Sequence, residues 1–443
     1  MKRLINFTKS IVKIKVFQNF SFLLLGNVGM QLLNLIAVML IAKVFQPELF
    51  GTYSFMVVQS MLLAAIADLG MKTILIRVAA SETSELNKTL SINVVSTLLT
   101  NFLLFFFYLT YNNFFGELSL VQVVLISLNS IAYGYNTSIE SVFLGKQKML
   151  PIATANIFNS IIWLLFVVFI LNEFISINVF FLVYILIFSL KPIQLTLKLY
   201  YKFNVRFKVN SIWQDFKVIF LKALPFWGLV MFSLPANYLA NNFLVYNSGI
   251  DQVAFFSLSQ KFTSPISMVL SLMLTSLFPN ISVLWINNKE GFQRLMFKGL
   301  PLFILLGTFL VTLFLMVIDP IFKMFFSSHY YSALIILKYQ IWYIFLFGVA
   351  SLIGTILTAM HQDKLLFKMA VLNSIIMTPF LWIGSKYEAI GLSLGYLLGF
   401  VIFLTIQWFI FTKKIELPAK FNYVWLFPII IFIISNASYF YNL

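Results

Sequence analysis

The chain has 443 residues, of which 61% are hydrophobic and only 10% charged, and its mean hydropathy is +0.96. A soluble domain carries about 25% charged residues, so this composition excludes a soluble protein and predicts an all-α polytopic membrane protein. The formal net charge of +16 would suit a nucleic-acid-binding protein, but the placement of the basic residues argues against nucleic acid as a partner.

Thirteen apolar runs are long enough for a helix to cross the bilayer core, which takes about 20 residues. They begin near Asn19, Phe50, Leu86, Leu118, Leu150, Ser176, Val218, Gln252, Leu295, Tyr331, Leu365, Ala389 and Tyr423. The first twelve are the predicted core helices. The last run, Tyr423 to Tyr441, is a candidate thirteenth helix. The sequence does not decide whether it crosses the membrane.

Basic residues alternate between the predicted turns. The N-terminal arm and the even-numbered turns hold 23 of the 30 Lys and Arg residues, whereas the odd-numbered turns hold Lys43, Lys323 and Lys386. This asymmetry is the positive-inside pattern, so we expect a cytoplasmic N-terminus. The predicted organisation is a basic arm at 1–18, an N-lobe of six helices at 19–202, a basic cytoplasmic linker at 203–217, a C-lobe of six helices at 218–412, and an inner turn with the candidate helix at 413–443.

The sequence lacks the residues needed for disulfide bonds and for a typical metal site, and it has no room for a soluble catalytic domain. The chain lacks cysteine, and its two histidines, His329 and His361, fall in turns on opposite sides, so we expect neither a disulfide nor a metal site. The connections are too short for a soluble catalytic domain, which predicts that the protein is not an enzyme. No cleavable signal peptide is evident.

Two short strings recur at the same offset. FNSII at Phe158 to Ile162 returns as LNSII at Leu372 to Ile376, and FGTYSF at Phe50 to Phe55 has a weaker echo in VAFFSL at Val253 to Leu258. Both echoes are six predicted helices apart. An even offset indicates a parallel repeat, which relates two six-helix lobes by an axis along the membrane normal.

Motifs along the chain resemble those of Wzx-type polysaccharide-unit flippases, in the superfamily of multidrug, oligosaccharidyl-lipid and polysaccharide (MOP) exporters. They are QPELFGTYSF followed by ADLGMKTILIR (Gln46 to Arg77), LGKQKM after the fourth span, LPFW at Leu224 to Trp227 and LFPNIS at Leu277 to Ser282. One departure lies in the seventh span, where many relatives carry an Arg/Asp pair and this chain has NYLANN (Asn237 to Asn242).

The resemblance implies a MATE-like fold and a flippase in the bacterial inner membrane. Its cargo would be an undecaprenyl-diphosphate-linked oligosaccharide repeat unit, moved from the cytoplasmic to the periplasmic leaflet by alternating access for O-antigen or capsule synthesis. A polysaccharide polymerase and a chain-length regulator are possible partners. No cofactor is expected beyond possible coupling to H⁺ or Na⁺.

Three lysines inside predicted spans lack an acidic residue nearby in the sequence: Lys191, Lys261 and Lys338. A charge on a spanning helix costs roughly 2.5–3.5 kcal/mol on insertion scales, so such residues usually face a cavity or a partner. Three ammonium groups would suit an anionic cargo such as a diphosphate. The alternative is that each reaches an interface or pairs with a carbonyl at a helix end.

Asp68 and Lys72 stand four residues apart and are expected to pair on one helical face, with Gly70 between them permitting a bend. One reading is a structural ion pair. The other is a protonatable site coupled to transport, with Glu140 of the fourth span as a possible neighbour.

The seventh span carries Asn237, Asn241 and Asn242, whose amides can donate to and accept from sugar hydroxyls. The alternative is that they hold helices together. Tyr238, Phe226 and Trp227 could stack on sugar rings. Among rival functions, a multidrug exporter shares the fold but handles cations that lysines would repel. A polymerase or glycosyltransferase usually shows a large outer loop or a carboxylate cluster, and the chain has neither.

Overall fold

The computed structural model describes residues 24–81, 85–116, 118–172, 175–203, 205, 212–415, 428 and 430–432. Within these ranges the secondary structure is helical and contains no strand. An α-helix satisfies its own backbone donors and acceptors inside lipid, which is why so apolar a chain forms helices. The predicted arm at 1–18, residues 206–211 of the predicted linker and most of the candidate thirteenth helix lie outside the described residues.

The chain divides into two compact units, Met1–Leu234 (unit 1) and Pro235–Leu443 (unit 2). Their boundary falls inside the predicted seventh span. The predicted lobe bounds at 19–202 and 218–412, and the linker at 203–217, stay predictions.

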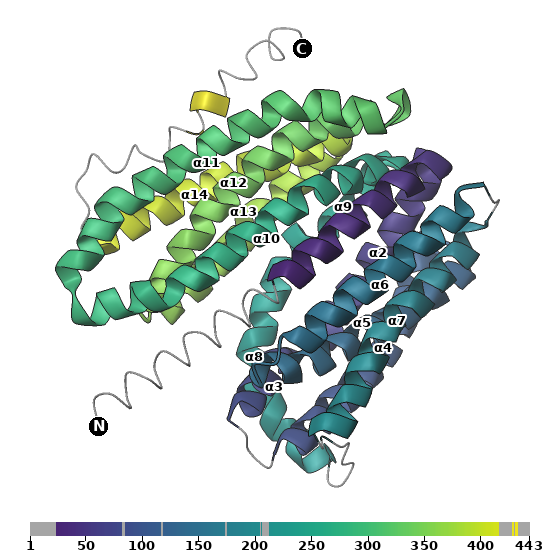
Figure 1. Ribbon diagram of the computed structural model, residues 1–443, viewed down its shortest axis with the longest axis horizontal. Helices are drawn as coiled ribbons and strands as arrows, with labels where there is room; N and C mark the ends of the chain where they lie inside the picture. Colours follow the sequence, from purple (N-terminus) through teal and green to yellow (C-terminus); the bar gives the residue numbers. More distant parts are fainter. Residues whose placement is uncertain are drawn as a thin grey trace. The chain divides into compact units, whose positions relative to one another are not determined.

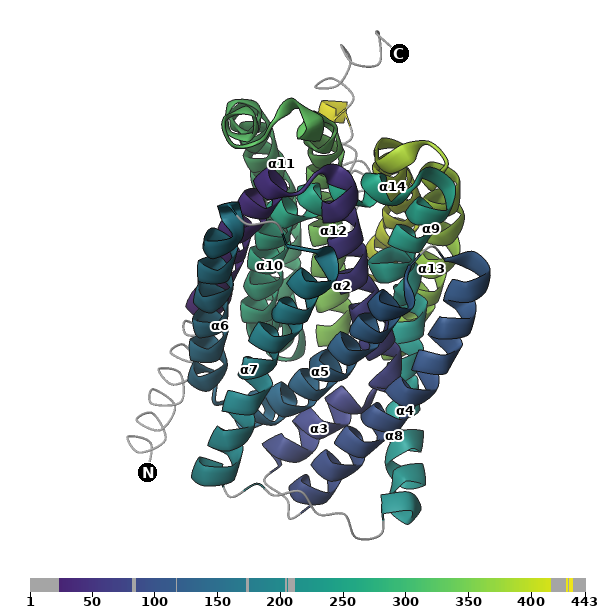
Figure 2. The ribbon, with the colours of Figure 1, turned by 90° about the vertical axis from the view of Figure 1, so that its right-hand side faces the viewer.

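Unit 1 is a helical bundle around one central helix. Its described elements are the helix Leu24–Val44, α2 (Pro47–Ala67), α3 (Met71–Ala80), α4 (Leu86–Phe115), α5 (Leu120–Gly145), α6 (Leu150–Phe169), a 3₁₀ turn at Ile170–Asn172, α7 (Ile177–Phe203) and α8 (Ile212–Leu234). The central helix, α5, packs against α2, α3, α4 and α7 (Figure 2). Its first turn is fixed by a capping box, in which the Ser119 hydroxyl accepts from the backbone N–H of Gln122 and the Gln122 side chain accepts from that of Ser119.

Unit 2 begins with an irregular turn and continues in long helices. Its described elements are a π-helical turn at Pro235–Leu239, α9 (Ala240–Ser248), α10 (Ile250–Asn287), α11 (Lys289–Phe325), a 3₁₀ turn at Ser328–Tyr330, α12 (Tyr331–Ala359), α13 (Asp363–Ser385) and α14 (Glu388–Ile415). In this unit α12 packs against α10, α11 and α14, and α13 packs along α14 (Figure 1).

Ten described segments are long and apolar enough to cross a membrane. Two further helices, α5 with 26 residues and α10 with 38, exceed the length of a span and occupy the fourth and eighth predicted runs. Together they account for the twelve predicted core helices. The prediction of an all-α polytopic membrane protein is confirmed.

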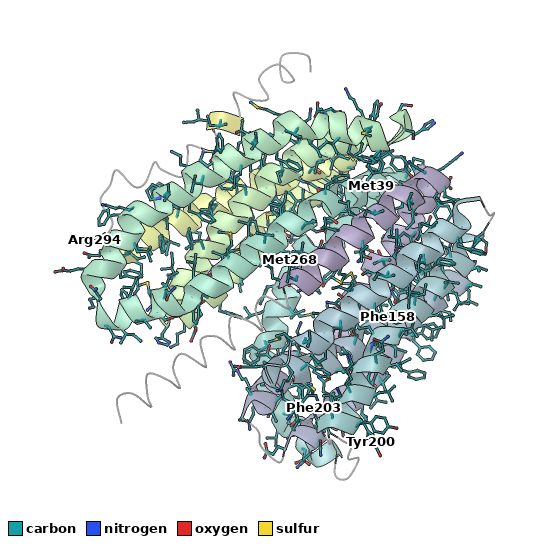
Figure 3. All side chains as sticks on the ribbon, in the orientation of Figure 1. Met39, Phe158, Tyr200, Phe203, Met268 and Arg294 are labelled. Atoms are coloured by element: carbon teal, nitrogen blue, oxygen red, sulfur yellow. The ribbon has the colours of Figure 1, made fainter. Side chains whose placement is uncertain are left out.

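Large apolar side chains cover much of the described surface, as Figure 3 shows. Phe107 on α4 is 69% exposed and Met316 on α11 is 73% exposed. Phe158 on α6, labelled in Figure 3, is also exposed. Such a surface is unfavourable in water but matches hydrocarbon, which fits a multi-pass membrane protein.

The second predicted span is broken, as the sequence suggested it could be at Gly70. The helix α2 ends at Ala67 and α3 starts at Met71, while Leu69 and Gly70 adopt positive φ angles of 52° and 74°. A Cβ on Gly70 would lie 2.6 Å from the carbonyl oxygen of Ala223 on α8. Glycine is therefore required both for its backbone conformation and for the close approach of α8.

Candidate functional site

Lys191 is paired, contrary to the prediction that it lacks an acidic partner. Its ammonium group forms an ion pair with the carboxylate of Glu140, joining α7 to α5, and the two side chains are 15% and 24% exposed. Nearby, the hydroxyls of Tyr135 and Thr196 lie 2.8 Å apart and link the same helices. The pairing depends on the packing of two helices far apart in sequence, so local sequence could not show it. It also gives Glu140, the suggested neighbour of Asp68, a partner on α7.

Lys338 is paired as well. Its Nζ donates to Oδ2 of Asp319 at 2.8 Å, joining α12 to α11. The sequence placed Asp319 in an outer turn, but α11 continues to Phe325, so the carboxylate lies on a helix beside the lysine. The prediction of an unpaired ammonium group is wrong at this position.

Lys261 on α10 differs from the other two lysines. Its side chain is exposed, and it has no ion pair with any residue that the structure describes. Its predicted role toward an anionic cargo stays a prediction, and of the three lysines it is the one whose charge is not neutralised by a described carboxylate.

Asp68 and Lys72 do not form the predicted side-chain ion pair. The helix breaks between them, so the two residues no longer lie on one helical face. Oδ2 of Asp68 instead accepts from the backbone N–H of Lys72 at 3.3 Å. The carboxylate thus satisfies a donor in the first turn of α3, where a negative charge is favourable. This geometry favours the structural reading of Asp68.

The two aromatic residues of LPFW contact the helices on either side of the break between α2 and α3. The indole Nε1 of Trp227 donates to the carbonyl of Ile66 at 3.2 Å, and the guanidinium carbon of Arg77 lies 4.8 Å from the centre of the Phe226 ring. Both rings pack within unit 1, so the suggested stacking on sugars has no support for Phe226 and Trp227.

Polar residues that the sequence analysis did not single out connect α4 to α5. Ser130 donates to Oδ1 of Asn101 at 2.5 Å, and Ser138 donates to Oδ1 of Asn93. All four side chains are buried. Amide and hydroxyl groups that pair in this way hold membrane helices together, so this part of unit 1 is a structural seam.

The asparagines of the seventh span have different surroundings. Pro235 lacks a backbone N–H, and the helix widens into the π-helical turn Pro235–Leu239. Asn237 lies in that turn and is exposed, Asn241 is buried on α9, and Asn242 is half-buried. The structure therefore places Asn237 alone at a cavity, and Asn241 and Asn242 in the packed part of α9.

The cavity measures about 200 Å³ and lies within unit 2. Eleven residues line it: Ala236 and Asn237 from the π-helical turn, Phe256, Gln260, Thr263 and Ser267 from α10, Gln340, Tyr343, Ile344 and Phe347 from α12, and Tyr396 from α14. The lining mixes amides and hydroxyls with aromatic rings and includes no charged side chain. π-Helical turns are frequent at functional sites.

Three of the polar lining residues follow a pattern visible in the sequence. Gln260, Thr263 and Ser267 recur at intervals of three and four, which is the spacing of one helical face. The three residues form a polar stripe within a part of α10 that also carries Ser257, Ser259, Lys261 and Ser264. Gln340, Tyr343 and Tyr396 complete the cavity from other helices, which no local pattern could reveal.

Among the described residues, no group of three or more His, Asp and Glu side chains could hold a metal ion. No curated protein matches the sequence. A family model described as "Polysaccharide biosynthesis protein" matches residues 16–285, which is more than half of the chain.

The chain belongs to this family.

Solved structures share its fold. The Lipid II flippase MurJ in an inward closed conformation superposes with a TM-score of 0.69 at 17% identity, covering 95% of this chain and 92% of that one. A MOP superfamily transporter from Pyrococcus furiosus matches with a TM-score of 0.63 at 12% identity, covering 91% and 95%. A mutant of the MATE transporter VcmN from Vibrio cholerae matches with a TM-score of 0.61 at 18% identity, covering 93% and 99%. The chain therefore shares the fold of these transporters.

Proposed function

We propose that the protein is a flippase that moves undecaprenyl-diphosphate-linked oligosaccharide repeat units across the bacterial inner membrane by alternating access. The cargo would pass from the cytoplasmic to the periplasmic leaflet, for O-antigen or capsule synthesis. Membership in the polysaccharide biosynthesis family carries the proposal. The fold shared with the Lipid II flippase MurJ supports it, because lipid II is also a lipid-linked saccharide.

Lys261 is the residue we assign to the diphosphate of the cargo. It is exposed and has no ion pair in the described part of the chain, so its charge is available to an anion. Lys191 and Lys338 contribute through their ion pairs, which keep α5 with α7 and α11 with α12. The neutral lining of the cavity in unit 2, including Asn237, suits the sugar part of the cargo better than the diphosphate.

The proposal includes an N-terminus on the cytoplasmic side, action without enzymatic chemistry, and work alongside a polymerase and a chain-length regulator. Coupling to H⁺ or Na⁺ would require a carboxylate within the bundle. Glu140 fits this role better than Asp68, because the Asp68 carboxylate is engaged at the first turn of α3, whereas protonation of Glu140 would release the ammonium group of Lys191.

An exporter of small molecules is the second candidate, favoured by the matches to MATE transporters. Deleting the gene from its host distinguishes the two. The flippase proposal expects surface polysaccharide to be lost and lipid-linked repeat units to accumulate, with unchanged sensitivity to cationic drugs. Normal surface polysaccharide with increased drug sensitivity would support the exporter instead.

A further inference from the structure

The size of the cavity in unit 2 limits what it can hold. Sites for drug-sized ligands measure about 300–1,000 Å³, whereas an apolar cavity of about 150 Å³ holds one benzene molecule. The cavity here measures about 200 Å³. The space between its walls matches one six-membered ring with small substituents, and a larger ligand would extend beyond it.

Hydroxyl oxygens in the cavity wall are arranged as acceptors. Thr263 and Ser267 each donate to a carbonyl of their own helix, at 3.2 and 2.9 Å. Tyr396 donates to the carbonyl of Ala236 at 2.5 Å. Each hydroxyl proton is therefore engaged, while each oxygen keeps lone pairs that can accept. A matching ligand has hydroxyl donors of its own.

Gln340 adds a buried acceptor without a partner. Its side chain is 4% exposed, and its Nε2 donates to the carbonyl of Phe256 at 3.5 Å. Its Oε1 has no hydrogen-bond partner among the described residues. A buried acceptor left unpaired is unfavourable. Because Gln340 lines the cavity, a turn of its amide toward that space would let a ligand hydroxyl satisfy the acceptor.

Aromatic rings supply the apolar part of the wall. The rings of Tyr343 and Tyr396 lie 5.0 Å apart, and Phe256 stacks on Tyr396 at 5.7 Å. Rings of this kind pack against the C–H faces of a pyranose. Since the lining contains no cation, a carboxylate or phosphate placed there would lose its hydration without gaining a counter-charge.

We infer that this cavity is a subsite for one uncharged sugar ring. The inference rests on the proposed function, in which the ring belongs to the lipid-linked cargo. Lys261 directly follows the cavity-lining Gln260 on α10. A diphosphate at Lys261 would therefore hold the sugar attached to it close to the cavity, and the two positions would divide the cargo into an anionic and a neutral part.

Saturation-transfer difference NMR on the full chain in lipid nanodiscs tests the subsite. The probes are the methyl glycosides of glucose, galactose and N-acetylglucosamine, with methyl glucuronoside as the anionic comparison. We expect at least one uncharged glycoside to bind and the glucuronoside to bind more weakly. Gln340→Leu should weaken that binding about fivefold, because a hydrogen bond to the ring is lost.

Gln407→Leu is the matched control. Gln407 is also buried, donates to a helix carbonyl (that of Ala350, at 3.3 Å) and has an unpaired Oε1, but it does not line the cavity. This variant should bind the glycoside as the wild type does. A similar loss in both variants would mean that the effect is structural and would overturn the subsite.

Two other outcomes would also overturn it: binding that Gln340→Leu leaves unchanged, or no binding of any uncharged glycoside to the wild type. A different result would contradict the proposed function. If deletion of the gene left surface polysaccharide intact while the purified protein still bound the glycoside through Gln340, the flippase role would be wrong and the sugar site would stand.

Discussion

Two regions of the molecule, the contacts of α5 with its neighbours in unit 1 and the cavity of unit 2, use polar side chains in different ways. Polar groups on α5 join it to neighbouring helices in pairs, as Glu140 with Lys191 and Asn101 with Ser130 do. Gln340, which lines the cavity of unit 2, instead has a buried acceptor with no partner among the described residues. A polar residue inside a membrane helix is thus a poor indicator of a binding site until its surroundings are known. Paired groups stabilise the bundle, whereas unpaired groups next to a cavity are available to a ligand.

The largest expected effect comes from breaking the ion pair between Glu140 and Lys191 in unit 1. Lys191→Ala leaves the carboxylate of Glu140 unpaired and should lower the free energy of unfolding by about 2–3 kcal/mol, below the 3–5 kcal/mol of a fully buried pair because both side chains are partly exposed. Thermal unfolding in detergent and the amount of protein in the membrane would show it.

The double variant Glu140→Gln, Lys191→Met serves as its control. It removes both charges and should recover most of the lost stability. If Lys191→Ala instead left stability unchanged and abolished surface polysaccharide, Lys191 would act on the cargo, and the comparison between the units would fail.

Replacing Lys261 should affect transport and leave stability unchanged, which is the reverse of the expectation for Lys191. Lys261→Ala is expected to reduce surface polysaccharide about tenfold at a normal level of protein, because it removes an exposed charge without leaving a buried partner. Lys261→Arg should rescue partly, since it keeps the charge and changes the geometry, and Lys261→Gln should not. Equal polysaccharide in Lys261→Ala and the wild type would remove this residue from the cargo site.

The seam between α4 and α5 offers a smaller test. Asn101→Leu removes the acceptor of Ser130 and should lower the free energy of unfolding by about 1–2 kcal/mol. We expect transport per molecule to stay normal once the amount of protein is taken into account. A loss of transport at unchanged stability would show that the seam contacts the cargo.

Tyr343→Phe should have the smallest effect on stability, within about 0.5 kcal/mol, because the residue lines a cavity and its ring is kept. Binding of an uncharged methyl glycoside should weaken about twofold to threefold if the hydroxyl contacts the sugar. A large loss of stability here would place Tyr343 in the packing of unit 2 rather than in its binding surface.

The sequence by itself determined the membrane character, the twelve long helices and the bend at Gly70. Each follows from a local property: the length of an apolar run, or a residue without a Cβ. The spacing of Gln260, Thr263 and Ser267 on one helical face is likewise a local property that the sequence contains. The resemblance stated from motifs such as PELFGTYSF agrees with the matched polysaccharide biosynthesis family, and the Wzx type stays a prediction.

Only the tertiary structure decided which charges are paired and which polar groups face open space. Lys191 meets Glu140 across two helices, and Lys338 meets Asp319 because α11 runs on past the predicted turn. The cavity needs side chains from three helices and a π-helical turn. These outcomes depend on how each helix is rotated about its axis and where it packs, and a single sequence specifies those only through contacts between residues far apart in the chain.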